Sequence, residues 1–206
     1  MSFYDRHIAP RLIDWSCGGN AVTPNRRRIV PEAEGRVLEI GAGSGLNLPF
    51  YDPARVSHLW ALEPDAAMRR LAQPRIADAP VGPDWLAASA EAIPLENASV
   101  DTVLTTYTLC TVPHEQRALA EIRRVLKPGG RLLFCEHGAA PNGRVRRWQD
   151  RLNGLNRCLG AGCNINRRPD RAIKIAGFTL ETLETGYLAG VPKIGAFTFL
   201  GAGRPT

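Results

Sequence analysis

The sequence predicts an α/β fold: a seven-stranded, mostly parallel sheet with helices on both faces and an antiparallel hairpin at the C-terminus. The chain has 206 residues, 44% of them hydrophobic and 22% charged, which is typical of one globular domain. From Arg36 onward, strand-type and helix-type hydrophobic patterns alternate, as they do when parallel strands are joined by helical crossovers. The connecting segments are short and rich in Pro and Gly, which favours a compact α/β domain.

Five strands are predicted in the first two thirds of the chain. They cover residues 36–40, 58–63, 84–89, 100–106 and 131–136. A helix over 114–126 places Ala118, Ile122 and Val125 or Leu126 on one face, and the Lys127–Gly130 turn is expected to end it. Another helix is expected to begin near Leu46, directly after the first strand.

The pattern changes after the fifth strand. Apolar residues then recur three and four positions apart, which predicts a helix with an apolar stripe facing the core: Val145, Trp148, Leu152, Leu155 and Leu159. Two last strand-type runs, 178–184 and 196–201, have little room for a helix between them and predict an antiparallel pair.

The N-terminus also shows helical spacing, at Ile8, Leu12 and Trp15, which predicts a helix lying across the domain. Tyr4 and His7 on that helix are candidates for a lid over a ligand. We therefore divide a single domain, 1–206, into a helical lid (1–30), a ligand-binding core (31–138), and an acceptor-side helix with the terminal strands (139–206).

Composition excludes several classes of protein. No apolar run reaches the 18 residues of a membrane span, and charged or polar residues interrupt the first apolar stretches at Asp5, Arg6, His7, Arg11 and Asp14. A soluble, cytoplasmic protein is therefore expected. The five cysteines contain no C-x-x-C pair and only four histidines accompany them, so neither a disulfide framework nor a metal site is predicted.

Positive charge is concentrated in one segment. Residues 141–171 contain eight arginines and two aspartates, a net charge of +6 that equals the net charge of the whole chain. The segment from Arg144 to Arg171 is a candidate for weak contact with an anionic substrate, a phospholipid surface or RNA. A solvated helix face is the alternative.

A glycine-rich turn follows the first strand, with Gly41, Gly43 and Gly45 two residues apart. Glycine lets the backbone turn sharply and approach a ligand closely. The turn is not a dinucleotide fingerprint, because Leu46 stands where the third glycine would be, and it lacks the Gly-Lys-Ser/Thr of a phosphate-binding P-loop. It is also not a nucleophile elbow, because Ser44 lacks glycines two residues to either side.

An acidic residue, Glu63, ends the second strand 22 residues after Gly41. A carboxylate at this place in a βαβ unit accepts hydrogen bonds from both hydroxyls of a ribose, which indicates an adenosine-type ligand. The segment 89–95 after the third strand would flank the adenine.

These motifs, EIGAGSG (39–45), AEAIPL (90–95) and RRVLKPGG (123–130), resemble those of the class I S-adenosylmethionine-dependent methyltransferases of the type 11 family. The resemblance covers about residues 30–138. It implies a Rossmann-like fold and S-adenosylmethionine as cofactor, with S-adenosylhomocysteine as product. The family often has Asp where this chain has Ser89, so the adenine contact would rely on Glu91 or on backbone groups.

The resemblance also implies contacts between particular residues and parts of the cofactor. The methionine portion would lie on the glycine turn, the ribose on Glu63, and the adenine on 89–91. The predicted cofactor-binding set is Glu39, Gly41, Ala42, Gly43, Gly45, Asn47, Glu63, Pro64, Ser89, Ala90, Glu91 and Thr106.

A narrower resemblance concerns the acceptor. TLCTV (108–112), EHGAAP (136–141) and GCNINR (162–167) are similar to segments of methyltransferase-like proteins that methylate alkyl thiols and hydrogen sulfide. Those proteins carry an N-terminal hydrophobic anchor, which this sequence is expected to lack. A small thiol is therefore the expected acceptor. The alternatives are N-, O- or C-methylation of a lipid, quinone or amine at a membrane surface, and a non-catalytic RNA-binding protein. No specific nucleic acid is expected, and the oligomeric state stays open.

Methyl transfer from a sulfonium is an in-line displacement, so alignment supplies most of the rate. Open α/β sheets bind ligands at the carboxyl ends of their strands. The catalytic candidates there are His137, Glu136 and Tyr107. His137 is a base, a substrate anchor or a strand cap; Tyr107 lines a methyl pocket or packs in the core; Cys110 is expected to be a packed thiol.

Overall fold

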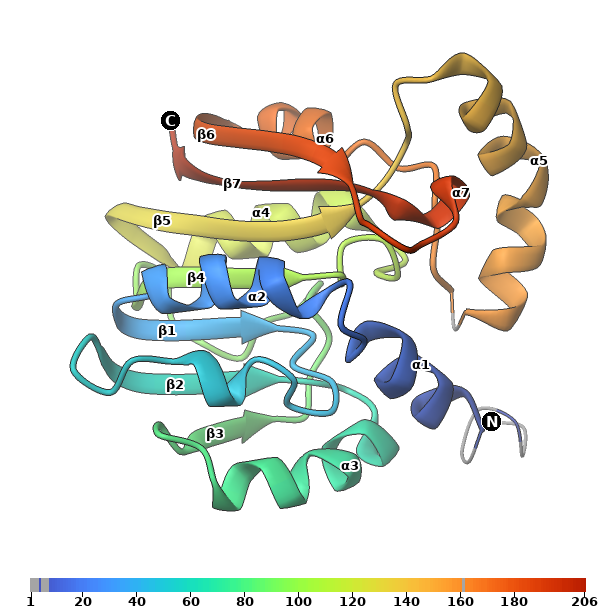
Figure 1. The fold of residues 1–206 in the computed structure, drawn as a ribbon. Helices are drawn as coiled ribbons and strands as arrows, with labels where there is room; N and C mark the ends of the chain where they lie inside the picture. The colour runs from blue at the N-terminus through green and yellow to red at the C-terminus, as the bar shows by residue number, and fades with distance from the viewer. Residues whose placement is uncertain (1–3, 5–7, 161) are drawn as a thin grey trace.

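The computed structural model describes residues 4, 8–160 and 162–206 and shows one seven-stranded sheet (Figure 1). The strand order is β3-β2-β1-β4-β5-β7-β6. The strands are β1 (Gly35–Ile40), β2 (Val56–Leu62), β3 (Pro83–Leu86), β4 (Val100–Thr106), β5 (Leu126–His137), β6 (Phe178–Tyr187) and β7 (Phe197–Pro205). The first five are parallel, and β7 runs antiparallel to both β5 and β6. The predicted sheet and terminal hairpin are confirmed.

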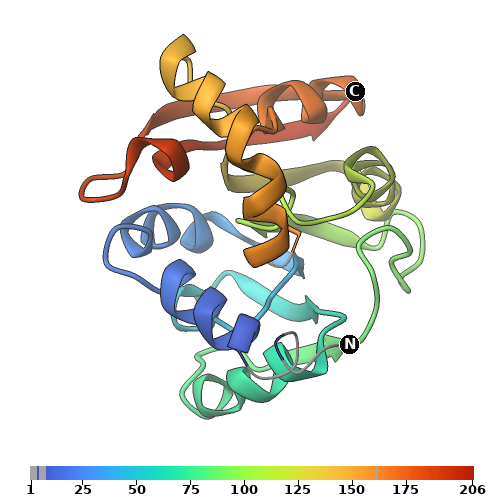
Figure 2. The same ribbon diagram turned by 90° about the vertical axis from the view of Figure 1, so that its right-hand side faces the viewer.

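Helices cover both faces of the sheet (Figures 1 and 2). They are α1 (Ala9–Cys17), α2 (Thr23–Ile29), α3 (Ala66–Ala77), α4 (Glu115–Val125), α5 (Gly143–Leu159), α6 (Pro169–Ile175) and α7 (Lys193–Ala196). Short 3₁₀ turns follow α2 (η2, Val30–Glu32) and β1 (η3, Leu48–Phe50). Successive side chains of a strand point to opposite faces, so β1 supplies Leu38 to the core under α4 and α6 and Val37 to the core under α2.

The helix predicted over 114–126 is α4. Ala118, Ile122 and Val125 are fully buried on one face, as their spacing predicts. The Lys127–Gly130 segment does not form a separate turn, because β5 begins at Leu126, directly after the helix.

The helix predicted near Leu46 is wrong. Residues 41–55, all described by the structure, form turns and the 3₁₀ segment η3, with no α-helix. Pro49 lacks a backbone N–H, and Gly45 and Asn47 are poor helix formers, so the segment after the turn does not propagate an α-helix.

The prediction that α5 turns its apolar stripe to the core is also wrong. The helix forms, but Trp148 is 52% exposed, and Leu152, Leu155 and Leu159 are exposed as well. Only Val145, near its start, packs partly against the core.

Polar side chains fasten α5 to the domain instead. Gln149 is fully buried; its amide nitrogen donates to the carbonyls of Gly138, Ile165 and Ile194, and its oxygen accepts from the Ala140 N–H. Asn153 and Asn156, one and two turns on, also bond to the loop that follows the helix. Loops present backbone groups that need partners, so the polar face of the helix is the one that lies against the protein.

We predict that Gln149→Leu destabilises the protein by about 2 kcal/mol or more, because it leaves buried backbone groups without partners. In a domain of this size that loss lowers the melting temperature by roughly 4–8 °C. Calorimetry measures the shift. Trp148→Ala on the exposed face is the matched control and should change the melting temperature little; equal shifts for the two variants would contradict the inverted orientation of α5.

Helix α1 lies at the carboxyl edge of the sheet rather than across it (Figure 1). Ile8, Leu12 and Trp15 are exposed, Trp15 by 77%, so the predicted apolar face does not face the core. Asp14 holds the helix in place: it accepts a hydrogen bond from Ser44 Oγ at 2.5 Å and pairs with Arg75 of α3 at 3.0 Å.

The proposed lid, 1–30, is only partly described. Tyr4 donates a hydrogen bond to the Leu159 carbonyl at 2.6 Å, joining the N-terminal segment to the end of α5. His7 lies outside the described residues. Helix α2 packs on the face of the sheet, so among the described residues of this segment α1 is the helix at the carboxyl edge of the sheet (Figure 1). Among the described residues, no helix combines the length and apolar content needed to cross a membrane.

Candidate active site

The glycine turn lies at the carboxyl end of β1, and its three glycines have left-handed backbone conformations. Gly41, Gly43 and Gly45 have φ values of +65°, +57° and +77°. A Cβ on Gly41 would lie 2.4 Å from Thr108 Oγ1, and one on Gly43 would lie 3.2 Å from Met68 Cε. The turn therefore depends on glycine both for its conformation and for its close packing.

Glu63 follows β2 and faces this turn. Its Oε2 accepts the Gly43 N–H at 3.0 Å and its Oε1 accepts the Asp65 N–H at 2.8 Å. Burial raises the pKa of Glu63. The predicted pairing of the glycine turn with the acid of the second strand is therefore present in the structure.

A buried polar network stabilises the residues that flank the turn. Asn47 donates to Glu39 Oε1 at 2.8 Å and to Thr106 Oγ1 at 2.9 Å, and Tyr51 donates to Glu39 Oε2 at 2.7 Å. Arg26 of α2 donates to Asn47 Oδ1 and Thr106 Oγ1, both at 2.6 Å. Burial raises the pKa of Glu39 to about 7. Glu39 and Asn47 thus hold the loop and do not reach the surface of the cavity.

The turn borders a cavity of about 220 Å³, which we call the donor cavity. Five of the predicted cofactor-binding residues line it: Gly41, Ala42, Gly43, Glu63 and Thr106. Residues that were not predicted to bind ligand also line it, including Ile13, Cys17, Arg26, Met68 and Thr108.

The other predicted cofactor residues lie outside this lining. Gly45 packs toward Leu48 and Ala72, and Pro64 is exposed next to Glu63. Ser89, Ala90 and Glu91 form a turn beyond β3, where Ser89 Oγ accepts the Glu91 N–H and Glu91 accepts the His114 N–H. Their contact with adenine stays a prediction.

A larger cavity of about 940 Å³, the acceptor cavity, adjoins the first. The two share one wall, formed by Ile13, Cys17, Leu46, Tyr107 and Thr111. Of the catalytic candidates, Tyr107 lines both cavities and His137 lines the acceptor cavity. Tyr107 has an unfavourable φ of +55°, typical of residues held in place at functional sites.

Glu136 is placed differently from the other two catalytic candidates. It is fully buried, lines neither cavity, and accepts the Thr108 N–H at 3.1 Å. Burial raises its pKa to about 7. In this position Glu136 holds the backbone at Thr108, and its direct contact with an acceptor stays a prediction.

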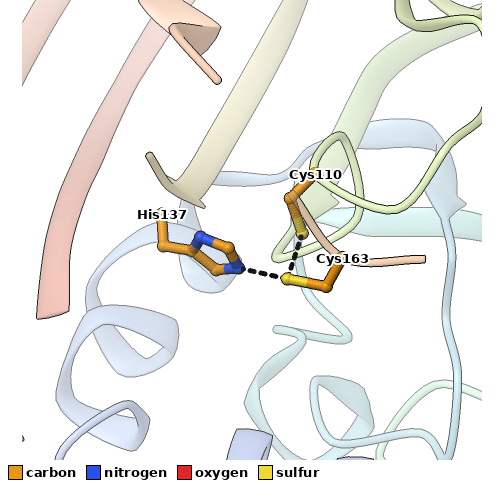
Figure 3. Close-up of side chains that lie close together, drawn as sticks. All are labelled: Cys110, His137 and Cys163. Atoms are coloured by element: carbon orange, nitrogen blue, oxygen red, sulfur yellow. Dashed lines mark hydrogen bonds between the residues drawn. The ribbon is translucent and has the colours of Figure 1, made fainter. Parts of the chain in front are cut away.

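Cys110, His137 and Cys163 meet at the acceptor cavity (Figure 3). Cys163 Sγ lies 3.1 Å from His137 Nε2 and 3.8 Å from Cys110 Sγ. Hydrogen bonding with Cys110 and contact with His137 lower the pKa of Cys163. Burial acts to lower the pKa of His137, but its contact with Cys163 raises it overall.

Comparison with known proteins agrees with this geometry. Residues 38–134, from β1 to β5, match the family described as a methyltransferase domain. The chain belongs to the class I S-adenosylmethionine-dependent methyltransferases. S-adenosylmethionine is therefore confirmed as the cofactor of its family.

Two curated relatives are similar to this methyltransferase over most of its length. It is 32% identical over 152 residues to thiol S-methyltransferase TMT1B of Rattus norvegicus, covering 72% of this chain and 62% of the relative. It is 31% identical over 158 residues to thiol S-methyltransferase TMT1A of Homo sapiens, covering 75% and 64%. The matches thus span less than two thirds of each relative.

A solved structure shows the same fold. The S-adenosylmethionine-dependent methyltransferase of Thermotoga maritima superposes with a TM-score of 0.67 at 23% identity, covering 98% of this chain and 99% of that one. Identity this low supports the fold and nothing finer.

Sequence reasoning missed Arg26 and Cys163 as site residues. Arg26 is one of three consecutive arginines, and only packing shows that it, rather than Arg27 or Arg28, is buried at the donor cavity. Cys163 lies in the GCNINR segment, on which the family resemblance partly rests. No short sequence motif links it to Cys110 or His137.

Proposed function

We propose that this methyltransferase transfers the methyl group of S-adenosylmethionine to the sulfur of a small thiol. The observation that carries this proposal is that the two cavities adjoin along five shared lining residues, which would place a donor and an acceptor side by side. Two of the relatives carry the name thiol S-methyltransferase, which supports the choice of a thiol.

The residues of the donor cavity fit the cofactor. The bare glycine turn and the Glu63 carboxylate offer backbone and acceptor groups to the methionine portion and the ribose. When bound, the cofactor supplies an electrophilic methyl group on a sulfonium. The chain's contribution is alignment of acceptor and methyl group, which is worth about 7–11 kcal/mol in well-oriented reactions.

Arg26 fits the carboxylate of the cofactor's methionine portion. It is buried at the donor cavity, it makes no salt bridge among the described residues, and its Nε has no hydrogen-bond partner there. A buried cation without a directly paired carboxylate is costly, and an anionic ligand group would relieve that cost.

We predict that Arg26→Met raises the dissociation constant of S-adenosylmethionine by about tenfold, because a charge-assisted contact of about 1.5 kcal/mol or more is lost. Isothermal titration calorimetry measures it. Exposed Arg27→Met is the matched control and should bind normally. Unchanged affinity in the Arg26 variant would show that another group holds the carboxylate.

The proposed function is tested with the purified protein, S-adenosylmethionine and a panel of simple alkyl thiols and sulfide. We expect S-adenosylhomocysteine and the methyl thioether to form in equal amounts. Matched alcohols and amines serve as controls. Methylation of these alcohols or amines, together with no methylation of any thiol, would overturn the thiol assignment while leaving methyl transfer intact.

The outward face of α5 favours a second candidate function, binding to a membrane surface. Trp148, Leu152 and Leu155 are exposed on this helix, and the Arg151 guanidinium lies 5.6 Å from the centre of the Trp148 ring. Five exposed arginines lie on the same helix: Arg144, Arg146, Arg147, Arg151 and Arg157. An apolar stripe with many cations fits an anionic lipid surface, and we propose that α5 lies on one.

Of the three remaining arginines of the basic segment, two bond within the protein and the third, Arg171, is exposed. Arg167 donates to the carbonyls of Leu109 and Val112, and Arg168 pairs with Asp170 at 2.8 Å. The cationic surface is therefore mainly that of α5.

We predict that the protein co-sediments with vesicles containing phosphatidylserine and not with vesicles of phosphatidylcholine alone. Added salt should release it, because surface charge attraction is screened. Trp148→Ala with Leu155→Ala should weaken binding, whereas the exposed apolar substitution Ile175→Ala on α6 should not. Equal binding to both vesicle types would contradict the proposed charge contribution.

A further inference from the structure

We propose that Cys110, His137 and Cys163 bind a zinc ion whose fourth coordination position is open to the thiol acceptor. The inference deepens the proposed function and rests on it for the identity of the acceptor. The sequence predicted no metal site, because the cysteines form no C-x-x-C pair and few histidines accompany them. The three residues lie 26 or more positions apart along the chain.

The ligand set and its geometry suit zinc. The Cys110 and Cys163 sulfurs and an imidazole nitrogen of His137 all lie within 4.8 Å of one another. A tetrahedral ion about 2.3 Å from two thiolates holds them about 3.8 Å apart, which is the observed Cys110–Cys163 separation. The same geometry needs about 3.6 Å between sulfur and nitrogen, so the 3.1 Å Cys163–His137 contact would open by about 0.5 Å.

The two cysteines are held in position by their backbones. The Cys110 carbonyl accepts from both the backbone and the side-chain nitrogen of Asn164, each at 2.9 Å, which joins the two cysteine loops. Asn156 of α5 donates to the Cys163 carbonyl at 2.7 Å. His137 ends β5, a central strand of the sheet. Such support limits the reorganisation that metal binding would require.

The open position would face the acceptor cavity, which all three ligands line. Among the described residues the cluster contains these three ligands and no fourth. Three protein ligands with one open position are typical of catalytic zinc sites, whereas structural sites are closed by four. Thr111, which follows Cys110 in the chain, lines both cavities, so the open position would lie near the side of the acceptor cavity that borders the donor cavity.

Zinc would supply a nucleophile at neutral pH. A thiol that binds the ion loses its proton to solvent, because metal coordination stabilises the thiolate. The thiolate sulfur then forms a bond to the methyl carbon as the carbon–sulfonium bond breaks. The electron pair of that bond stays with the departing sulfur, which leaves as a neutral thioether, and no oxidant or reductant is required.

The first test is metal content and cobalt substitution in the whole chain without a histidine tag. We expect about one zinc ion per chain, and thiolate-to-cobalt charge-transfer absorption after exchange with Co²⁺. Adding a simple alkyl thiol without S-adenosylmethionine should strengthen that absorption, because a further sulfur joins the ion.

Variants locate the site. His137→Ala and Cys163→Ser should reduce zinc content at least about fivefold, and Cys158→Ser, at an exposed cysteine of α5, is the matched control that should retain it. His137→Cys should also retain zinc, which separates loss of a ligand from misfolding. Retention of full zinc content by His137→Ala would overturn the site.

The outcomes separate this inference from the proposed function. Wild-type protein that takes up neither ion, or that contains a Cys110–Cys163 disulfide in place of metal, overturns the zinc site. Full thiol turnover after removal of zinc by a chelator overturns its role while the proposed function stands. A cobalt spectrum that does not respond to thiol overturns the open acceptor position, and absence of turnover on every thiol overturns the proposed function itself.

Discussion

Replacing Gly43 by valine is expected to abolish binding of S-adenosylmethionine. Gly43 has a φ of +57°, a conformation that β-branched residues avoid, and a Cβ at this position would already lie 3.2 Å from Met68 Cε. Both residues line the donor cavity, which holds only about 220 Å³, so the valine methyl groups would occupy ligand space. Calorimetric titration should show affinity at least about 100-fold weaker, equivalent to about 2.7 kcal/mol.

The controls for this variant distinguish loss of ligand space from misfolding of the protein. Gly43→Ala should bind with intermediate affinity, because it carries the backbone strain but less volume. Gly154→Ala, on α5, has nothing within 4 Å of the new Cβ and should bind normally. Wild-type affinity in a folded Gly43→Val protein would mean that the cofactor does not use this turn.

The second large effect is expected at Glu63. Glu63→Ala should raise the dissociation constant for S-adenosylmethionine at least about tenfold, because hydrogen bonds to a charged acceptor contribute about 1.5–3 kcal/mol. The variant also removes the acceptor for the Gly43 and Asp65 N–H groups, which shapes the turn. Equilibrium binding measures the loss directly.

The matched variants test the ribose contact itself. Glu63→Gln retains an acceptor oxygen and should lose less affinity than Glu63→Ala. Glu96→Ala removes an exposed glutamate and should leave binding unchanged. Unaltered affinity in Glu63→Ala would show that the ribose assignment is wrong.

Much of the donor site was predictable because its parts follow one another along the chain. Gly41 and Gly43 come directly after a buried strand, and parallel pairing of β1 with β2 brings Glu63 to the same edge. The alternation of strands and helices sets this pairing, so local patterns carry the long-range consequence.

Two failures of sequence reasoning have different causes. A βαβ unit is expected to have a helix after its first strand, and that is why a helix was predicted near Leu46. The helix does not form, because Gly45, Asn47 and Pro49 disfavour helical backbone. On α5 the apolar spacing correctly predicted a helix but not its orientation, which depends on the loop carbonyls that Gln149 meets.

The sequence alone therefore determined the sheet, the glycine turn, the acid that faces it and the methyltransferase family, because each depends on residues in short, ordered stretches. Only the tertiary structure decided which arginine is buried at the donor cavity, which face of α5 meets water, and that Cys110, His137 and Cys163 converge. Those features arise from side chains that are far apart along the chain, and only the folded packing sets their distances and burial.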